Sequence, residues 1–214
     1  MPKTPRPSLH VIDHPVVARL LTVARDRATP PPQFRHALAQ IGLLLAYEAT
    51  RDLATARVPT VTPMEETKGY TLKKPVSIVP ILRAGLGLAE GIVQLLPEAQ
   101  IGHIGMFRDE RALRPVSYYQ KLPARIAQGT TLLVDPMLAT GGSAMAGVEL
   151  LKQHGCRDFR LICLVAAPEG VDRLTAEHPD TPIYTAALDR ELDERGYILP
   201  GLGDAGDRLF GTVE

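Results

Sequence analysis

The sequence is poor in cysteine, carries no net charge and lacks long apolar runs. Its two cysteines, Cys156 and Cys163, have a spacing that fits no zinc site, and reduced thiols are expected. Basic and acidic residues number 24 each, which argues against binding nucleic acid or a membrane surface through bulk positive charge. No run approaches the roughly 18 apolar residues of a membrane span, and the segment MPKTPRPSLH holds no apolar signal core. We therefore expect a soluble, cytoplasmic protein with no nucleic-acid and no membrane partner.

What is present is typical of one globular domain over residues 1–214. Hydrophobic residues make up 45% of the chain and charged residues 22%, and a chain of this length can bury a large core without disulfides. Residues 1–8 are rich in proline and are expected to form a loose arm. Apolar patterning predicts a helix over 14–27 that the prolines at 30–32 end, then a second helix over 33–56. Two short strands are predicted within 58–72, around a Lys68-Gly69 turn.

The rest of the chain alternates short apolar runs with helical segments. The runs lie at 76–82, 101–107, 131–134, 160–165 and 183–187, and the helical segments at 87–96, 143–154 and 169–177. Apolar runs without polar alternation indicate parallel strands that are buried on both faces. The sequence therefore predicts an α/β fold with a doubly wound, mostly parallel sheet and helices on both faces. In such a sheet ligands bind beyond the carboxyl ends of the strands, so the residues after each run are the candidates for a site.

The stretch VDPMLATGGSA contains the third of these strand ends. Asp135 ends the strand, Gly141 and Gly142 let the backbone approach a ligand, and Thr140 and Ser143 offer hydroxyls where a helix begins. Unpaired N–H groups at a helix start favour a phosphate, whereas the upstream carboxylate suits sugar hydroxyls. A ribose 5-phosphate group has both features. The alternative is a plain strand–loop–helix connection with Ser143 as the N-cap.

This stretch resembles the diphosphoribosyl-binding motif of the type I phosphoribosyltransferases. Most of that family has two adjacent acids, and Pro136 replaces the second here, which leaves Asp135 as the ribose partner and resembles the uracil phosphoribosyltransferase branch. VPILRAG, YYQKL, LVAAPEG and YILPGLGDAGD extend the resemblance over about residues 9–213. It implies the type I phosphoribosyltransferase fold, with N-terminal helices, a β-hairpin and a C-terminal base-binding hood. It also implies that 5-phospho-α-D-ribose 1-diphosphate (PRPP) contacts Asp135, Pro136, Met137, Leu138, Ala139, Thr140, Gly141, Gly142 and Ser143.

Two further strand ends supply arginines. Arg83 follows the first run and can bind a diphosphate through several donors, or it is an ordinary surface arginine. The glycines after it give GxGxxxG, one residue longer than a dinucleotide fingerprint. By the resemblance, LRAG is the diphosphate loop, which in the wider family often holds a cis peptide bond, and Arg108 in GMFRDE also contacts PRPP. The loop over residues 111–123 is either a lid or a mobile surface hairpin.

The C-terminal stretch GLGDAG matches the dinucleotide fingerprint but stands too late in the chain. Eight residues follow Gly206, which leaves no room for the helix, second strand and acid that the fingerprint requires. A glycine-dense loop instead exposes backbone groups that can match the acceptor–donor–acceptor edge of uracil, or it is a tail with no ligand. The resemblance makes residues 189–214 the uracil-binding segment. It places Ile198, Gly203, Asp204 and Ala205 at the base, with Asp204 also facing PRPP through its metal.

The resemblance implies that uracil and PRPP react to give UMP and diphosphate, with Arg83, Asp135 and Asp204 as catalytic residues. Mg²⁺ is the expected cofactor, held mainly by substrate oxygens. Two alternatives stay open: transfer to another base on the same fold, and a non-catalytic regulator that binds nucleotide and RNA. The family suggests a homo-oligomer, a dimer or a tetramer. Regulation by a nucleotide such as GTP cannot be read from the residues.

Overall fold

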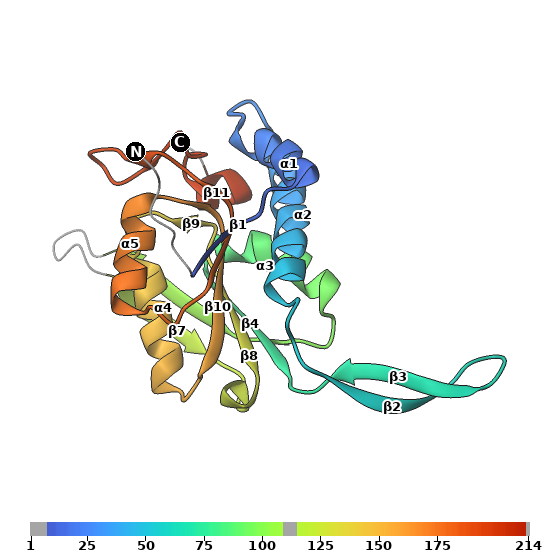
Figure 1. The fold of residues 1–214 in the computed structure, drawn as a ribbon. Helices are drawn as coiled ribbons and strands as arrows, with labels where there is room; N and C mark the ends of the chain where they lie inside the picture. Colours follow the sequence, from blue (N-terminus) through green and yellow to red (C-terminus); the bar gives the residue numbers. More distant parts are fainter. Residues whose placement is uncertain (1–7, 109–114, 213–214) are drawn as a thin grey trace.

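The protein is described by a computed structural model that covers residues 8–108 and 115–212 (Figure 1). Its helices are α1 (Pro15–Arg25), α2 (Pro31–Ala49), α3 (Gly85–Leu95), α4 (Gly142–Gln153), α5 (Pro168–Glu177) and α6 (Ala205–Phe210), with a 3-10 turn at Ile126–Gln128. The strands are β1 (Leu9–Val11), β2 (Thr55–Val61), β3 (Glu66–Leu72), β4 (Val76–Leu82), β5 (Gln100–Ile101), β6 (His103–Arg108), β7 (Pro115–Lys121), β8 (Thr130–Val134), β9 (Met137–Leu138), β10 (Asp158–Ala166), β11 (Ile183–Leu188), β12 (Glu191–Leu192) and β13 (Ile198–Leu199).

The main sheet has the strand order β1-β11-β10-β8-β4-β6-β7. Its neighbours pair in parallel except β6 with β7, which form an antiparallel edge. The chain leaves β4 through α3 and returns to the sheet on one side, whereas it leaves β8 through α4 and returns on the other. Strand order therefore reverses between β4 and β8, and a ligand crevice is expected where those two strands end.

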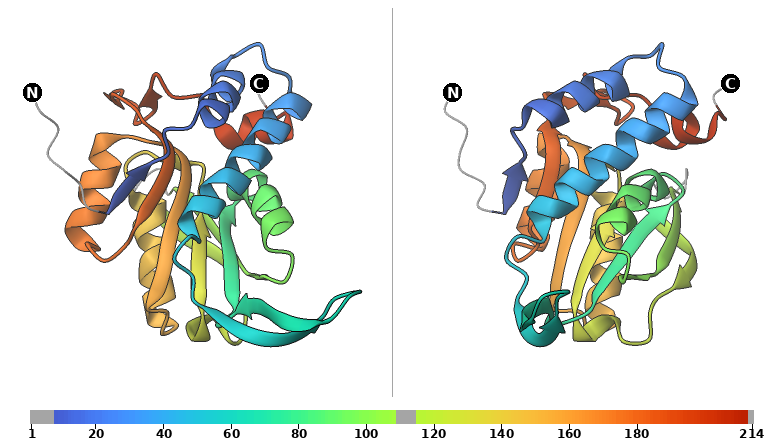
Figure 2. Two further views of the ribbon diagram at one scale, coloured as in Figure 1. Left: turned by 45° about the vertical axis from the view of Figure 1, so that its right-hand side comes forward. Right: turned by 90° about the vertical axis from the view of Figure 1, so that its right-hand side faces the viewer.

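Helices cover both faces of this sheet (Figure 2). Ile78 and Leu132 join the hydrophobic cluster that contains residues of α1, α2 and α3. Their chain neighbours Val79 and Leu133 join the cluster under α4 and α5. Successive strand residues point to opposite faces of the sheet. Both faces are buried here, which explains why apolar and polar residues do not alternate along the strands. The predicted α/β fold class is confirmed.

The N-terminal part corrects several predicted bounds. The first helix ends at Arg25, capped by the backbone of Asp26, before the proline run is reached. Pro31 and Pro32 instead begin α2, where a missing N–H costs no hydrogen bond. That helix ends at Ala49 rather than near residue 56, because residues from Thr55 onward already pair as β2.

One turn and one helix also differ from expectation. Lys68 and Gly69 lie inside β3, paired with Pro59 and Val58, and the hairpin turns at residues 62–65. The GLGDAG stretch, judged to have no room for a helix with its strand and acid, nevertheless begins the short helix α6. Residues 1–7 of the predicted loose arm lie outside the described part of the chain, and Ser8 is held by the N–H of Ile183.

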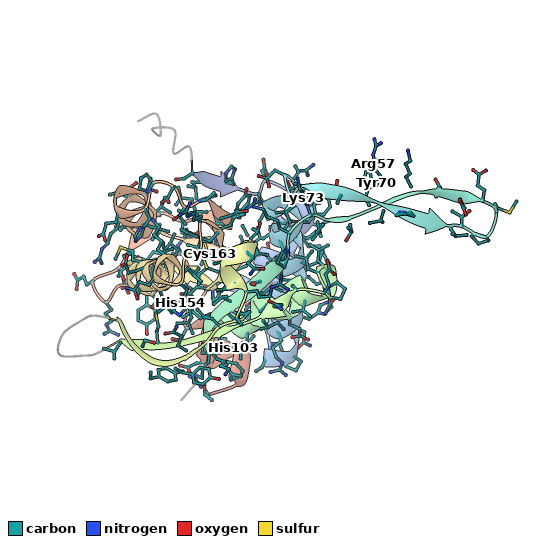
Figure 3. The ribbon with its side chains drawn as sticks, turned by 90° about the horizontal axis from the view of Figure 1, so that it is seen from below. Arg57, Tyr70, Lys73, His103, His154 and Cys163 are labelled. Carbon is teal, nitrogen blue, oxygen red and sulfur yellow. The ribbon has the colours of Figure 1, made fainter. Side chains whose placement is uncertain are left out.

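The β2–β3 hairpin projects from the body at the end away from α6 (Figure 1). Seen from below, Arg57 and Tyr70 lie in the half of the hairpin nearer the body (Figure 3), and they face each other across the two strands. Tyr70, Val61 and Met64 are 67%, 76% and 92% exposed. Among the described residues, no helix combines the length and apolar character that a membrane crossing needs.

Candidate functional site

The loop between β8 and α4 surrounds a small cavity. We call this segment, residues 135–143, the cradle, since the sequence predicts that it binds a phosphate. The volume of the cavity is about 80 Å³. The cavity is lined by Asp135, Met137, Leu138, Ala139, Thr140, Gly141, Gly142, Ser143 and Ala144. Eight of these nine residues were predicted to contact PRPP, and the ninth predicted member, Pro136, is buried beside them. The structure therefore brings nearly the whole predicted set around one hollow.

Gly141 fixes the geometry of this cradle. It adopts a φ of +80° and caps α4 without any side-chain hydrogen bond, a conformation that favours glycine. The N–H groups of Gly142, Ser143 and Ala144 have no hydrogen-bond acceptor within the described residues. Ser143 lies inside the helix, so the alternative in which it serves as the N-cap is wrong. Three backbone donors and the positive end of the helix dipole are left to face an anion.

The start of α5 packs directly against the same loop. A side chain at Gly170 would collide with the carbonyl oxygen of Ala139, and one at Gly141 would come within 3.2 Å of the Gly170 carbonyl oxygen. The guanidinium of Arg173 donates to the carbonyl of Thr140 at 3.5 Å. This packing holds the cradle in one shape without occupying it.

Asp135 lies at the carboxyl end of β8, as predicted. Its N–H donates to the carbonyl of Ile162 at 3.1 Å, so the backbone is still part of the sheet. Part of the side chain reaches solvent, yet protein atoms surround the carboxyl, and this burial raises its pKa to about 7. The N–H of Met137 acts in the opposite direction by donating to the carboxylate. A carboxyl of this kind can accept hydrogen bonds from a diol at neutral pH.

The Arg83 loop lies against the end of β8. A side chain at Gly85 would come within 2.5 Å of the Val134 carbonyl oxygen, so the loop after β4 touches the residue before Asp135. The Leu82–Arg83 peptide bond is cis, as the resemblance implies for the diphosphate loop. Arg83 itself is exposed, with its guanidinium 3.4 Å from Asp207 and 5.6 Å from the centre of the Phe210 ring.

Arg108 and the loop after it are described only in part. Arg108 is the last residue of β6, and its backbone pairs with Pro115 of β7. The predicted contact of its side chain with PRPP lies outside the described residues, as do residues 111–114 of the loop predicted over 111–123. Most of the rest of that predicted loop is strand β7. Tyr118 covers Gly105, where an added side chain would collide with its ring.

The C-terminal segment lies over these strand ends and contains the predicted base-binding residues. Ile198 is buried in the β12–β13 hairpin, Gly203 and Asp204 are exposed, and Ala205 is buried at the start of α6. Asp204 caps α6 by accepting the N–H of Asp207 at 2.9 Å. An added side chain at Gly206 would meet Ala84, so α6 begins beside the Arg83 loop. Cradle, diphosphate loop and hood thus meet at one edge of the sheet.

Sequence reasoning missed the residues that hold the hood in place. Arg208 stacks on the ring of Phe34, 4.3 Å from its centre, and donates to the carbonyls of Ala24, Asp26 and Leu202. Arg35 donates to the carbonyl of Leu209 at 2.8 Å. These are contacts between distant parts of the chain that leave no local pattern. A signal did exist for Asp189, which follows the last apolar run after one further residue, Leu188, and is buried.

The described residues contain no group of three or more His, Cys, Asp or Glu side chains placed to hold a metal ion. Mg²⁺ bound with a phosphorylated substrate needs only one or two protein carboxylates, since phosphate oxygens and waters supply the rest. Asp204 is exposed beside the Arg83 loop, and Asp207 follows it. The carboxylates at this edge therefore fit a substrate-bound Mg²⁺.

Comparison with known proteins gives the same assignment. The family described as uracil phosphoribosyltransferase matches residues 11–212. The uracil phosphoribosyltransferase of Salinibacter ruber is 52% identical over 95% of this chain and 97% of its own, and that of Acholeplasma laidlawii is 54% identical over 95% and 98%. The structure of the AQ2163 protein from Aquifex aeolicus superposes with a TM-score of 0.90, at 33% identity over 94% of this chain and 97% of its own.

A more distant structure shows the shared fold. The orotate phosphoribosyltransferase of Mycobacterium tuberculosis, in complex with 5-phospho-α-D-ribosyl 1-diphosphate, has a TM-score of 0.51 and 16% identity, covering 83% of this chain and 93% of its own. The match at family level spans almost the entire described chain, including the cradle, the Arg83 loop and the hood. This chain belongs to the uracil phosphoribosyltransferase family.

Proposed function

We propose that this protein transfers ribose 5-phosphate from PRPP to N1 of uracil. A bond forms between N1 and the anomeric carbon, the bond from that carbon to diphosphate breaks, and the N1 proton passes to solvent, giving UMP and diphosphate. The meeting of cradle, Arg83 loop and glycine-rich hood at one sheet edge carries this proposal, and membership of the family supports it. The reaction serves pyrimidine salvage, and the lack of a membrane-spanning helix in the described part of the chain is compatible with a cytoplasmic site.

Each part of the site has a distinct chemical task. The unpaired N–H groups at the start of α4 bind the 5′-phosphate, and Asp135 accepts hydrogen bonds from the ribose diol. The anomeric carbon becomes oxocarbenium-like as diphosphate leaves, so positioning and charge stabilisation matter more than a nucleophilic side chain. Arg83 and Arg108 offset the charge of the leaving group. Ile198, Gly203, Asp204 and Ala205 bind uracil, largely through main-chain groups that match its polar edge.

Mg²⁺ is the proposed cofactor. When bound to the diphosphate it would supply charge neutralisation for the leaving group, and Asp204 is the carboxylate that would face it. One oxygen of Asp204 already caps α6. Its other carboxylate oxygen would therefore face Mg²⁺ while the side chain stays in its capping position.

We further propose a homo-oligomer, a dimer or a tetramer. The observation behind it is the β2–β3 hairpin, which leaves the body and exposes Val61, Met64 and Tyr70. A two-stranded ribbon is marginal on its own in water, so a second subunit that covers it would stabilise it. Sedimentation velocity of the full chain checks the assembly, and a monomer at micromolar concentration would contradict this proposal.

Diphosphate release tests the proposed reaction. The protein is incubated with PRPP, Mg²⁺ and one base at a time: uracil, orotate, hypoxanthine or adenine. We expect turnover with uracil only. Preference for another base would contradict the uracil assignment, and binding of UMP and RNA without turnover would favour the non-catalytic regulator.

Asp204→Asn isolates the charge of Asp204 from its capping role. Asparagine is as good an N-cap as aspartate, so the variant keeps α6 while it removes the negative charge. We expect turnover to fall about 100-fold, as for loss of one charge-stabilising group, with an unchanged melting temperature. Normal turnover would remove Asp204 from the catalytic residues.

A further inference from the structure

An ion pair between distant elements holds the backbone of the base-binding segment. Arg25 is the last residue of α1, and Asp189 follows β11. The two Nη atoms of Arg25 contact the two carboxylate oxygens of Asp189 at 2.5 and 2.9 Å. The Asp189 side chain is 4% exposed and that of Arg25 24%, so this is a largely buried, two-pronged pair.

Both partners also bind the peptide groups of Gly201. The N–H of Gly201 donates to Oδ2 of Asp189 at 3.0 Å, and its carbonyl accepts from Nη1 of Arg25 at 2.8 Å. Gly201 has a φ of +57°, and a side chain there would collide with the carbonyl of Ile198. The turn between Ile198 and Gly203, the first two predicted uracil contacts, is therefore fixed at its middle by one ion pair.

Helix α6, the last part of the hood, is hydrogen-bonded to the same C-terminal end of α1. Arg208 of α6 donates to the carbonyls of Ala24 and Asp26, on either side of Arg25, and also to Leu202. The end of α1 thus holds Gly201, and α6 holds the end of α1. The base-binding segment cannot shift without breaking contacts of two arginines, although neither belongs to the cradle or to the diphosphate loop.

We propose that Arg25 and Asp189 are positioning residues for the nucleobase, which set the main-chain donors and acceptors that recognise uracil. This inference rests on the proposed function for the identity of the base. Main-chain recognition works only if the peptide groups stay within a fraction of an ångström of the productive geometry. Loosening the turn should therefore weaken binding of uracil and reduce the preference for uracil over other bases, while the phosphate cradle between β8 and α4 stays intact.

Arg25→Lys is the most direct test. Lysine keeps the positive charge but cannot make the two-pronged contact with a carboxylate and a carbonyl at once. We expect KM for uracil to rise about tenfold or more, the effect of losing one charge-assisted hydrogen bond. KM for PRPP should change less than about twofold, and the preference for uracil over cytosine in kcat/KM should fall. Asp189→Asn, which keeps an acceptor for Gly201, should have a smaller effect on the same quantities.

Arg160→Lys is the matched control. Arg160 is 7% exposed and binds Asp52 and the carbonyl of Ala49 near the amino ends of the strands, at the opposite edge of the sheet. Its replacement loosens the contacts of another buried arginine, whose partner Asp52 is exposed, so the melting temperature should fall while both KM values stay near wild type. Hydrogen exchange of residues 198–210 should accelerate in Arg25→Lys and not in Arg160→Lys. This measurement needs no enzymatic activity, so it tests the inference even in a variant that has lost turnover.

The outcomes separate this inference from the proposed function. An unchanged KM for uracil in Arg25→Lys, or an equal rise for uracil and PRPP, would show that the pair only stabilises the fold and would overturn the inference. If the wild type turned over a different base, the proposed function would fail, and the same comparison with that base would still decide the role of Arg25.

Discussion

Replacing Asp135 by asparagine should stabilise the free protein while it damages the site. Burial raises the pKa of Asp135 from 3.8 to about 7, so the folded state holds a proton that the unfolded chain has already lost. Stability from this group is complete below about pH 4 and is lost as pH rises to about 7. The full shift corresponds to about 4 kcal/mol at pH 8. Because part of the side chain reaches solvent, we expect a penalty of about 2 kcal/mol.

Asparagine has nearly the same shape, keeps an oxygen that can accept the N–H of Met137, and has no charge to bury. Asp135→Asn should therefore raise the free energy of unfolding by about 2 kcal/mol at pH 8, or the melting temperature by about 4–8 °C for a chain of this size. At pH 4 the gain should fall below about 1 kcal/mol, since the wild-type carboxyl is neutral in the folded state and still partly protonated in the unfolded one.

Calorimetry of both proteins at pH 4 and pH 8 without ligand measures this difference. In parallel, kcat/KM for PRPP should fall, because a neutral amide is a weaker acceptor for the ribose hydroxyls than a carboxylate. A stabilisation of equal size at both pH values would refute the reasoning, since burial of the charge could not be its cause. Loss of stability at pH 8 would refute it as well.

Two substitutions test other parts of the site, and a thiol reagent tests the core. Gly141→Ala should cost about 1 kcal/mol of stability through its φ of +80° and raise KM for PRPP, measured by calorimetry and initial rates. Arg83→Met should raise KM for PRPP at least about tenfold with an unchanged fold, because the side chain is exposed. The thiol of Cys163, fully buried with a pKa raised to about 12, should resist a thiol reagent at pH 8 until the protein unfolds, as mass spectrometry can follow.

The main sheet was predictable because its residues carry the information locally. The runs at 76–82, 131–134 and 160–165 coincide closely with β4, β8 and β10, since strands buried on both faces need uninterrupted apolar side chains. The cradle was predictable for a similar reason: Asp135, Gly141 and Gly142 follow one another within a single strand–loop–helix connection. The fold class and the local geometry of the cradle therefore both followed from short stretches of sequence.

What could not be predicted depends on contacts between distant segments. The turn of the β2–β3 hairpin was placed at Lys68-Gly69, a pair typical of turns, but pairing of Thr55 with Leu72 sets the register and carries Gly69 into the strand. There Gly69 lies under the side chain of Thr60, which an added Cβ would meet. Likewise, no local pattern relates Arg25 to Asp189, which stand 164 positions apart.

The GLGDAG stretch was excluded as a dinucleotide-binding fingerprint, and the helix that begins within it was therefore not predicted. It was rejected as a dinucleotide fingerprint for want of space, yet Asp204 within it caps a helix of six residues. That helix is short because Gly211 ends it in a left-handed conformation, with a φ of +70°. Its shortness does not weaken it, since Leu209 packs against α3 at Gly87 and Arg208 joins it to α1 and α2. A helix too short to be stable alone thus becomes rigid through tertiary contacts, and it holds Asp204 at the edge where the proposed substrates meet.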